Sequence, residues 1–197
     1  MQYKRVLTIA GSDPSGGAGI QADLKTISAC GCFATSAITA VVDENTVGVY
    51  GVHPIPTLFV QGQIKSVLDD IGTDAIKIGM LHSSELIYVV KETISAYNIR
   101  NIVLDPVMVA TSGDKLLQDE AISTLKNELI PQVRVITPNI PEAEILLGLK
   151  IEKQADLKRV VKNLSFDRRV SVLLKAGHLS EEYLTDIFYN AETGRNY

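Results

Sequence analysis

Short apolar runs alternate along the chain with longer segments in which apolar residues recur at the helical period. In segment 18–29, for example, Ile20, Leu24 and Ile27 fall at positions i, i+4 and i+7, which places them on one helix face. The apolar runs predict strands at residues 6–10, 33–42, 47–55, 75–79, 102–105, 134–137, 170–175 and 184–189. The periodic segments predict helices at residues 18–29, 58–71, 85–97, 119–130, 141–147 and 157–164.

This alternation of strands and helices predicts an α/β fold with a mostly parallel sheet, right-handed crossovers and helices on both faces. Segment 47–55, Val-Gly-Val-Tyr-Gly-Val-His-Pro-Ile, alternates like a half-exposed strand, and we interpret it as a flap. No charge block, low-complexity tract or long linker divides the chain. We therefore expect residues 1–197 to form a single domain.

The composition is that of an ordinary globular protein, with 46% hydrophobic and 21% charged residues. A net charge of −4 gives no electrostatic reason to expect a nucleic acid or an anionic membrane as partner. The sequence has neither a long apolar span nor a signal-peptide pattern. Cys30 and Cys32 are too close for a comfortable disulfide and lack zinc-knuckle spacing, so we expect free thiols and a cytoplasmic location.

Polar residues and glycines follow six of the predicted strands. Because ligands of open α/β sheets bind beyond the carboxyl ends of the strands, these residues are candidates for a site. An ordinary turn explains any one of them, but six in succession favour a ligand. They are segments 11–13, 43–45, 79–80, 105–106, 137–139 and 175–177.

The first of these segments opens a glycine-rich loop, Gly-Ser-Asp-Pro-Ser-Gly-Gly-Ala-Gly at 11–19, which leads into a helix. Two interpretations stay open: its N–H groups bind a polar or anionic ligand, or it is a connector in which Asp13 or Ser15 caps the helix. No Gly-Lys-Ser/Thr follows, so the loop is not a Walker A motif.

A dinucleotide fingerprint is the competing interpretation of the same loop. Gly17, Gly19 and Ala22 match its spacing, and Asp43 ends the next strand where a ribose-binding acid is expected. However, the fingerprint needs its glycines in the tight turn directly after the strand, whereas Gly17 stands seven residues beyond Ala10. A nicotinamide-dependent oxidoreductase is therefore the weaker hypothesis.

Four residues near the later strand ends suit a phosphate site. Asp105 ends an apolar strand, where it could orient Mg²⁺, and Lys175 could face phosphates or be an ordinary surface lysine. Asn139 and Glu142 straddle the first turn of a helix. They either arrange Mg²⁺ and its waters around a triphosphate or form a capping box.

Other residues also have two interpretations. Asp23 is either a ligand contact or an acid that complements the helix dipole. Glu44 and Asn45 either grip a heterocycle or close a turn. Met80 either stacks on a flat ligand or fills the core.

Taken together, these segments resemble one family, the hydroxymethylpyrimidine/phosphomethylpyrimidine kinases of thiamine biosynthesis. The resemblance is colinear over the whole chain, and its long first motif is highly specific. The matching motifs lie at 8–23, 77–81 (Lys-Ile-Gly-Met-Leu), 103–108 (Val-Leu-Asp-Pro-Val-Met) and 136–143 (Ile-Thr-Pro-Asn-Ile-Pro-Glu-Ala). It implies the ribokinase-like fold, a three-layer α/β sandwich with a small lid.

By this resemblance, MgATP phosphorylates 4-amino-5-hydroxymethyl-2-methylpyrimidine and then its monophosphate, and a homodimer is expected. Asp105 and Glu142 would hold Mg²⁺, and Asn139 and Lys175 would contact ATP. The residues implied for the pyrimidine pocket are Gly11, Ala18, Asp23, Glu44, Met80 and Val107.

The chain departs from the family pattern at three places. Glu44 stands where much of the family has Gln, and as a carboxylate it would suit a donor-rich or cationic ring. Ala176 replaces the first Gly of the usual Lys-Gly-Gly-His. The Gly-Thr-Gly-Cys segment, which in the family supplies the anion hole and the catalytic base, would lie beyond Tyr197, so we expect these residues to be part of a longer protein.

Two further hypotheses accompany the pyrimidine kinase. Pyridoxal kinase is the near neighbour within the same class, because related enzymes accept both rings. A non-catalytic pyrimidine-binding protein is the alternative if the chain acts without that final segment.

Overall fold

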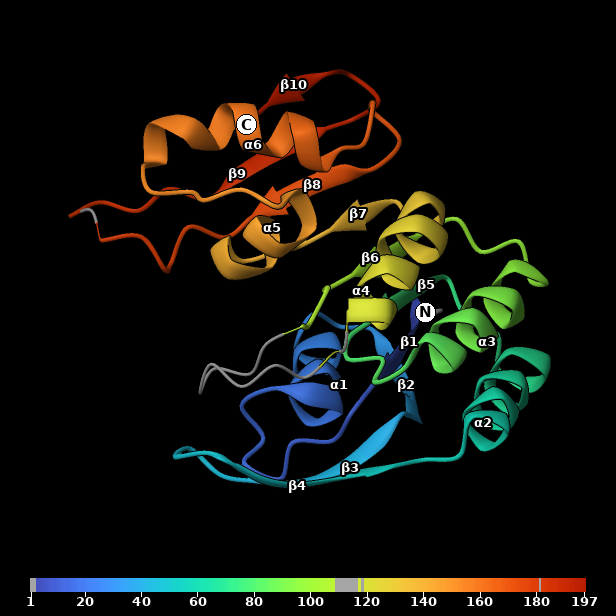
Figure 1. Ribbon diagram of the computed structural model, residues 1–197. Coiled ribbons are helices and arrows are strands. Elements are labelled where there is room, and N and C mark those ends of the chain that lie inside the picture. The colour runs from blue at the N-terminus through green and yellow to red at the C-terminus, as the bar shows by residue number, and fades with distance from the viewer. Residues whose placement is uncertain (1–2, 109–116, 118, 181) are drawn as a thin grey trace.

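The computed structural model describes residues 3–108, 117, 119–180 and 182–197 (Figure 1). An eight-stranded sheet has the order β10-β9-β8-β7-β6-β5-β1-β2. Its strands are β1 (Arg5–Ala10), β2 (Phe33–Ile38), β5 (Ala75–Ile78), β6 (Ile102–Leu104), β7 (Val135–Ile136), β8 (Ser171–Leu174), β9 (Ile187–Asn190) and β10 (Arg195–Asn196). Within this sheet, β8, β7, β6, β5, β1 and β2 pair in parallel in that order. Only β9 and β10 pair antiparallel to a neighbour, which confirms the predicted, mostly parallel sheet.

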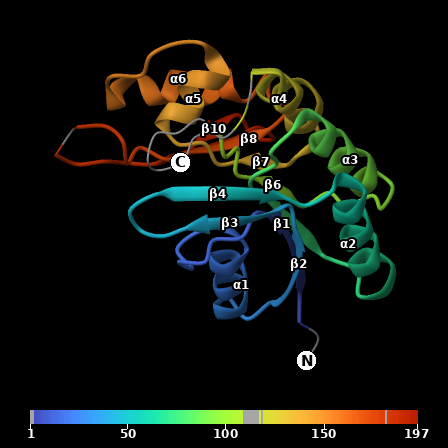
Figure 2. The ribbon, with the colours of Figure 1, turned by 60° about the horizontal axis from the view of Figure 1, so that its bottom comes forward.

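Helices lie on both faces of this sheet, as predicted. Helix α1 packs against β1 and β2 on one face, whereas α2, α3 and α4 pack side by side on the other (Figure 2). In the described part of the chain, no helix is long and apolar enough to cross a membrane. The helices are α1 (Gly19–Ala29), α2 (Thr57–Asp70), α3 (Ser84–Ser95), α4 (Asp119–Thr124), α5 (Ile140–Leu147) and α6 (Leu157–Leu164).

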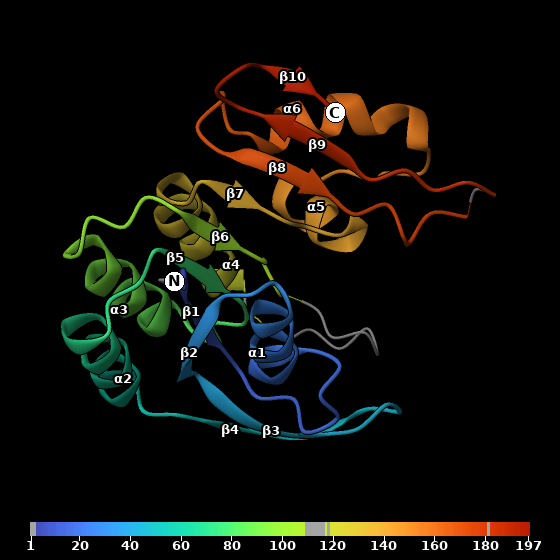
Figure 3. The same ribbon diagram turned by 180° about the vertical axis from the view of Figure 1, so that it is seen from behind.

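The two faces of the sheet differ in how well they are covered. On the face of α2 and α3, the side chains of Leu7, Ile9 and Ile78 are fully buried. Beyond α1, the described helices leave the other face open (Figure 3), and Val103 and Leu173 are half-buried there. The main core therefore lies between the sheet and the helices from α2 to α6, and Leu146 of α5 and Val160 of α6 are part of it.

The predicted strand 33–42 is wrong as a single element, because the chain leaves the main sheet at Thr39. Strand β1 ends at Ala10, whose carbonyl accepts the last inter-strand hydrogen bond from Thr39 N (2.9 Å). Because β1 has ended, the chain continues as β3 (Ala40–Glu44), which pairs antiparallel with β4 (Val49–Pro54). These two strands form a separate small sheet, as expected for the flap predicted from 47–55.

Smaller differences follow from local chemistry. The predicted helix 119–130 is α-helical only to Thr124 and continues as a π turn (Leu125–Leu129) and a 3-10 turn (Ile130–Gln132). Pro131, inside the 3-10 turn, has no N–H group for the hydrogen bond that would extend the α-helix. Helix α5 begins at Ile140, so Pro141 is its second residue rather than its first. The two-residue strand β10 was not predicted, because it is too short to show a period.

Candidate active site

The glycine-rich loop between β1 and α1 is organised by its own acid, Asp13. The Asp13 side chain is buried, and its two oxygens accept hydrogen bonds from Ser15 N (2.7 Å) and Ala18 N (2.6 Å). Burial raises the pKa of Asp13, but hydrogen bonds from Ser15, Ala18 and Gly17 outweigh it and leave that pKa below its usual value. Asp13 therefore binds N–H groups of its own loop in place of an external anion. The prediction that Asp13 or Ser15 caps the helix is wrong, because the N-cap of α1 is Ala18 and no side chain caps the helix.

Two glycines of this loop have close neighbours, and at Gly19 the backbone requires glycine. A Cβ on Gly11 would lie 2.9 Å from Met80 Cε, so Gly11 and Met80, both predicted for the pocket, are in contact across the ends of β1 and β5. Gly19 has φ +56°, and a Cβ there would lie 2.6 Å from the Gly11 carbonyl oxygen. Because β1 ends at Ala10 and α1 begins only at Gly19, Gly17 and Gly19 do not lie in the tight turn directly after the strand that a dinucleotide fingerprint needs.

Asp23 on α1 joins Thr8 and Lys77 in what we call the Asp23 triad. Thr8 Oγ1 donates to Asp23 Oδ2 at 2.6 Å, and Lys77 Nζ donates to the same oxygen at 2.9 Å. The side chains of Asp23 and Lys77 are 15% and 27% exposed. Asp23 is thus an ion-paired, largely buried acid and not an isolated helix-dipole residue.

The flap is attached to the glycine-rich loop at Ser12. Ser12 N donates to the Ala40 carbonyl, and Ser12 Oγ accepts from Val42 N, both at 2.9 Å. This places Glu44, at the end of β3, beside Asp13. Burial raises the pKa of Glu44, and the negative charge of Asp13 and a hydrogen bond with its side chain raise it further.

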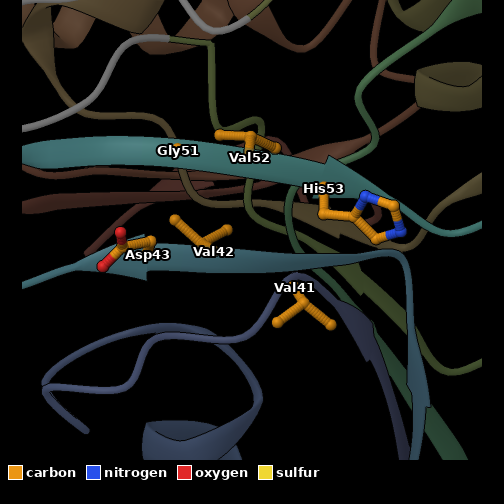
Figure 4. Close-up of a pocket in the computed structure, with 6 residues that line it drawn as sticks. All are labelled: Val41, Val42, Asp43, Gly51, Val52 and His53. Atoms are coloured by element: carbon orange, nitrogen blue, oxygen red, sulfur yellow. The ribbon is translucent and has the colours of Figure 1, made fainter.

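Of the two roles considered for Asn45, the structure shows the second, in which its side chain closes a turn. Its Oδ1 accepts hydrogen bonds from Val47 N (2.8 Å), Gly48 N (3.3 Å) and Tyr50 Oη (3.2 Å). These contacts close the turn between β3 and β4. A surface hollow lies along the same flap (Figure 4), lined by Val41, Val42, Asp43, Gly51, Val52 and His53.

A second set of the same three residue types, the Asp105 triad, lies at the carboxyl ends of β6, β7 and β8. Lys175 Nζ lies 2.9 Å from Asp105 Oδ1, and Thr137 Oγ1 donates to the same oxygen at 3.0 Å. The side chains of Asp105 and Lys175 are 27% and 38% exposed. Two of the predicted phosphate-site residues are therefore brought together as an ion pair.

Asn139 and Glu142 form the capping box that their spacing allowed. Asn139 Oδ1 accepts from Glu142 N (2.9 Å), and Glu142 Oε2 accepts from Asn139 N (2.8 Å). Glu142 is 3% exposed, and burial raises its pKa to about 7, aided by the Asp105 charge and opposed by the backbone hydrogen bonds and Lys175. The structure brings Glu142 close enough to Asp105 and Lys175 for their charges to act on it.

The remaining predicted residues lie at the margins of this arrangement. Ala18 is the exposed N-cap of α1, and Val107 is half-buried, its N–H donating to the Asp105 carbonyl at 2.8 Å. Ala176 is buried, and its N–H donates to Asp186 Oδ1 at 2.8 Å. Within the described ranges, no cluster of three or more His, Cys, Asp or Glu residues could hold a metal ion by itself.

Sequence reasoning missed Thr8 and Lys77. Both are polar residues inside otherwise apolar strands, Val-Leu-Thr-Ile-Ala and Ala-Ile-Lys-Ile. That interruption was the available signal, because a strand position surrounded by apolar residues is expected to be buried on at least one face. Their common partner, Asp23, was not readable from their spacing.

The comparisons with known proteins point to one family. The family model described as phosphomethylpyrimidine kinase matches residues 13–197. A hydroxymethylpyrimidine/phosphomethylpyrimidine kinase of Bacillus subtilis is 44% identical over 191 residues, which are 96% of this chain and 70% of the relative. One of Haemophilus influenzae is 48% identical over 175 residues, 89% of this chain and 65% of the relative.

Solved structures agree with this. A phosphomethylpyrimidine kinase from Clostridium difficile has a TM-score of 0.88 at 45% identity and covers 98% of this chain and 84% of its own. A Staphylococcus aureus pyridoxal kinase in complex with ADP has a TM-score of 0.85 at 37% identity, over 98% of this chain and 70% of its own. Both the α/β fold and the class of enzyme predicted from the sequence are thereby confirmed.

Proposed function

Because this chain belongs to the hydroxymethylpyrimidine/phosphomethylpyrimidine kinase family, we propose that it supplies the substrate and nucleotide sites for phosphorylation of 4-amino-5-hydroxymethyl-2-methylpyrimidine and its monophosphate by ATP. The observation that carries the proposal is the pairing of two polar sites along one sheet. One contains the Gly11–Met80 contact and Asp23, and the other contains Asp105 and Lys175.

In this proposal the pyrimidine lies at the first site. The Gly11–Met80 contact offers a flat, soft surface for a ring. Asp23 and Glu44 offer hydrogen-bond acceptors to its amino group, and Ala18 and Val107 complete the pocket. The hydrogen bonds from Ser15 N and Ala18 N to Asp13 hold the backbone of the loop beside this site in one conformation.

The nucleotide phosphates lie at the second site, close to Lys175 and Asn139. Oxygen donors suit Mg²⁺, and the residues present fit such an ion: Asp105 keeps Oδ2 free of Lys175 and Thr137, and Glu142 stands close by. Bound Mg²⁺ would neutralise charge on the phosphates. A positioned lysine and acid at this point serve charge stabilisation, the main requirement of phosphoryl transfer.

No catalytic base is assigned. The Gly-Thr-Gly-Cys segment that the family resemblance implies does not occur in the 197 residues. The chain spans 65% to 73% of the first curated relatives it matches. The complete transfer reaction of the whole protein is therefore part of the proposal.

Ligand binding tests the proposal without relying on turnover. Calorimetric titration with MgATP, the hydroxymethylpyrimidine, its monophosphate, pyridoxal and NADH should show binding of MgATP and of both pyrimidines. Pyridoxal is the second candidate acceptor, because kinases of that substrate are among the structural neighbours at 37% identity. Binding of pyridoxal without either pyrimidine would overturn the assignment, and binding of NADH without MgATP would favour the oxidoreductase.

Homodimerisation is also proposed, with the flap as the contact. Tyr50 and Val52 alternate onto one face of β4 and are 63% and 42% exposed, which leaves apolar surface there for a second copy to cover. Sedimentation velocity should give a dimer for the wild type and a monomer for Val52→Asp. A monomeric wild type at micromolar concentration would contradict this part of the proposal.

A further inference from the structure

The Asp23 triad takes its three side chains from elements that are distant in the sequence. Thr8 on β1 and Lys77 on β5 are register partners in the parallel pairing, so their side chains leave the sheet next to each other on the face that α1 covers. Helix α1 places Asp23 across both of them. The triad is thus a tertiary contact between two central strands and the helix that follows the glycine-rich loop.

Both hydrogen bonds of the triad end on one oxygen of Asp23. Thr8 Oγ1 and Lys77 Nζ donate to Oδ2, whereas Oδ1 accepts no hydrogen bond from any residue that the structure describes. An ionised carboxylate has free lone pairs on both oxygens. Two donors on Oδ2 fix the orientation of the group and leave Oδ1 as the oxygen available to a ligand.

The Lys77 ammonium lies beside the residues that form the proposed ring site. A Cβ on Gly79 would lie 3.2 Å from Lys77 Nζ and 3.0 Å from Ala10 Cβ. The Lys77 ammonium therefore packs against Gly79, in space that a larger residue would partly fill. The next residue, Met80, is the one that contacts Gly11. The ion pair is therefore directly adjacent to the Gly11–Met80 contact.

We infer that Lys77 is a positioning residue of the acceptor site: together with Thr8 it holds the Asp23 carboxylate so that Oδ1 faces the aminopyrimidine. This inference rests on the proposed function, in which Asp23 contacts the ring. Lys77 acts through Asp23 and has no contact of its own with the substrate. Lys175 has the corresponding chemistry at the other site, where it is available to the phosphates instead.

A double-mutant cycle on the protein tests this, with the dissociation constants of 4-amino-5-hydroxymethyl-2-methylpyrimidine and of MgATP measured by calorimetry. Lys77→Met should weaken pyrimidine binding about tenfold, as expected for the loss of one charge-assisted hydrogen bond that orders the site. Asp23→Asn should weaken it at least as much. The double variant should bind no more weakly than Asp23→Asn alone, because Lys77 acts through Asp23.

Two matched variants separate positioning from general damage. Lys91→Met removes another largely buried lysine, 18% exposed and 2.9 Å from Glu128 Oε2, but on α3, and it should change neither dissociation constant. Thr8→Val removes the second donor to Oδ2 without changing the side-chain volume. It should weaken pyrimidine binding several-fold and serves as the test if Lys77→Met does not fold.

The outcomes are distinct. Fully additive effects of Lys77→Met and Asp23→Asn, an equal loss of MgATP binding, or unchanged pyrimidine binding in both Lys77→Met and Thr8→Val would each overturn the inference. If the wild type binds MgATP but no pyrimidine, the proposed function fails together with it. If the wild type binds the pyrimidine and these variants bind it equally well, only the positioning role fails.

Discussion

The Asp23 and Asp105 triads consist of the same three residue types but occupy different depths of the molecule. In each, a lysine ammonium lies 2.9 Å from one carboxylate oxygen, and a threonine hydroxyl donates to that same oxygen. The Asp23 and Lys77 side chains are 15% and 27% exposed, against 27% and 38% for Asp105 and Lys175. The more buried Asp23 triad is suited to keep its side chains in a fixed arrangement. The more exposed Asp105 triad can exchange its ion pair for contacts with a charged ligand.

The difference arises from where each set is attached. Thr8 and Lys77 lie inside β1 and β5, whereas Thr137 and Lys175 come directly after β7 and β8. Side chains inside a strand are fixed by the sheet register and covered by a helix, here α1. Those beyond the strand ends face the ligand edge of the sheet and, in this case, the N-terminal turn of α5 with its buried Glu142.

Glu142 should give the largest effect that distinguishes the two regions, and the effect depends on pH. Its folded pKa of about 7 lies above the ordinary 4.5, so the folded state keeps a proton that the unfolded state has lost. Its contribution to stability is therefore complete below pH 4.5 and is lost as the pH rises toward 7. The shift corresponds to about 3 kcal/mol over this range, as an order of magnitude.

Urea unfolding at about pH 5 and about pH 7.5 measures this contribution. Wild type should lose more stability between these two values than Glu142→Gln, which cannot titrate. Other groups affect both proteins alike, so only the difference counts. Equal losses in the two proteins would show that Glu142 is ionised at both pH values and makes no pH-dependent contribution to the free energy of unfolding.

Lys175→Met should produce the next largest effect and should separate the two sites. Loss of the ammonium near the phosphates should weaken MgATP binding about tenfold to a hundredfold, the usual range for a hydrogen bond to a charged group. Pyrimidine binding should stay within about twofold of wild type, because Lys175 belongs to the Asp105 triad alone. A matching loss of pyrimidine affinity would mean that the two triads do not act as separate sites.

The smallest effect compares the two threonines. Thr8 is fully buried and donates at 2.6 Å, whereas Thr137 is half-buried and donates at 3.0 Å. Thr8→Val should therefore lower the free energy of unfolding by about 1 to 2 kcal/mol, and Thr137→Val by less than about 1 kcal/mol. Thermal and urea unfolding of both variants check the order, and a larger cost for Thr137→Val would reverse the proposed difference in depth.

Local features of this protein were readable from the sequence because they depend on neighbouring residues. The alternation of apolar runs and helical periods gave the α/β class and nearly all of the strands and helices. The spacing of Asn139 and Glu142 gave the capping box as one of two interpretations, and the motif at 8–23 gave the family. Asp105 and Lys175 were placed at one ligand edge because parallel strands end on the same side.

Tertiary structure decided what depends on register and on contacts between distant segments. Only the pairing of β1 with β5, with α1 across them, brings Thr8 and Lys77 to Asp23. Likewise, Thr39 leaves the main sheet because β1 ends at Ala10, which no periodicity within 33–42 could show. The sequence by itself determined which residues could carry charge at this site. The fold determined which lysine each acid is paired with, because the partners lie 54 positions apart for Asp23 and Lys77 and 70 positions apart for Asp105 and Lys175.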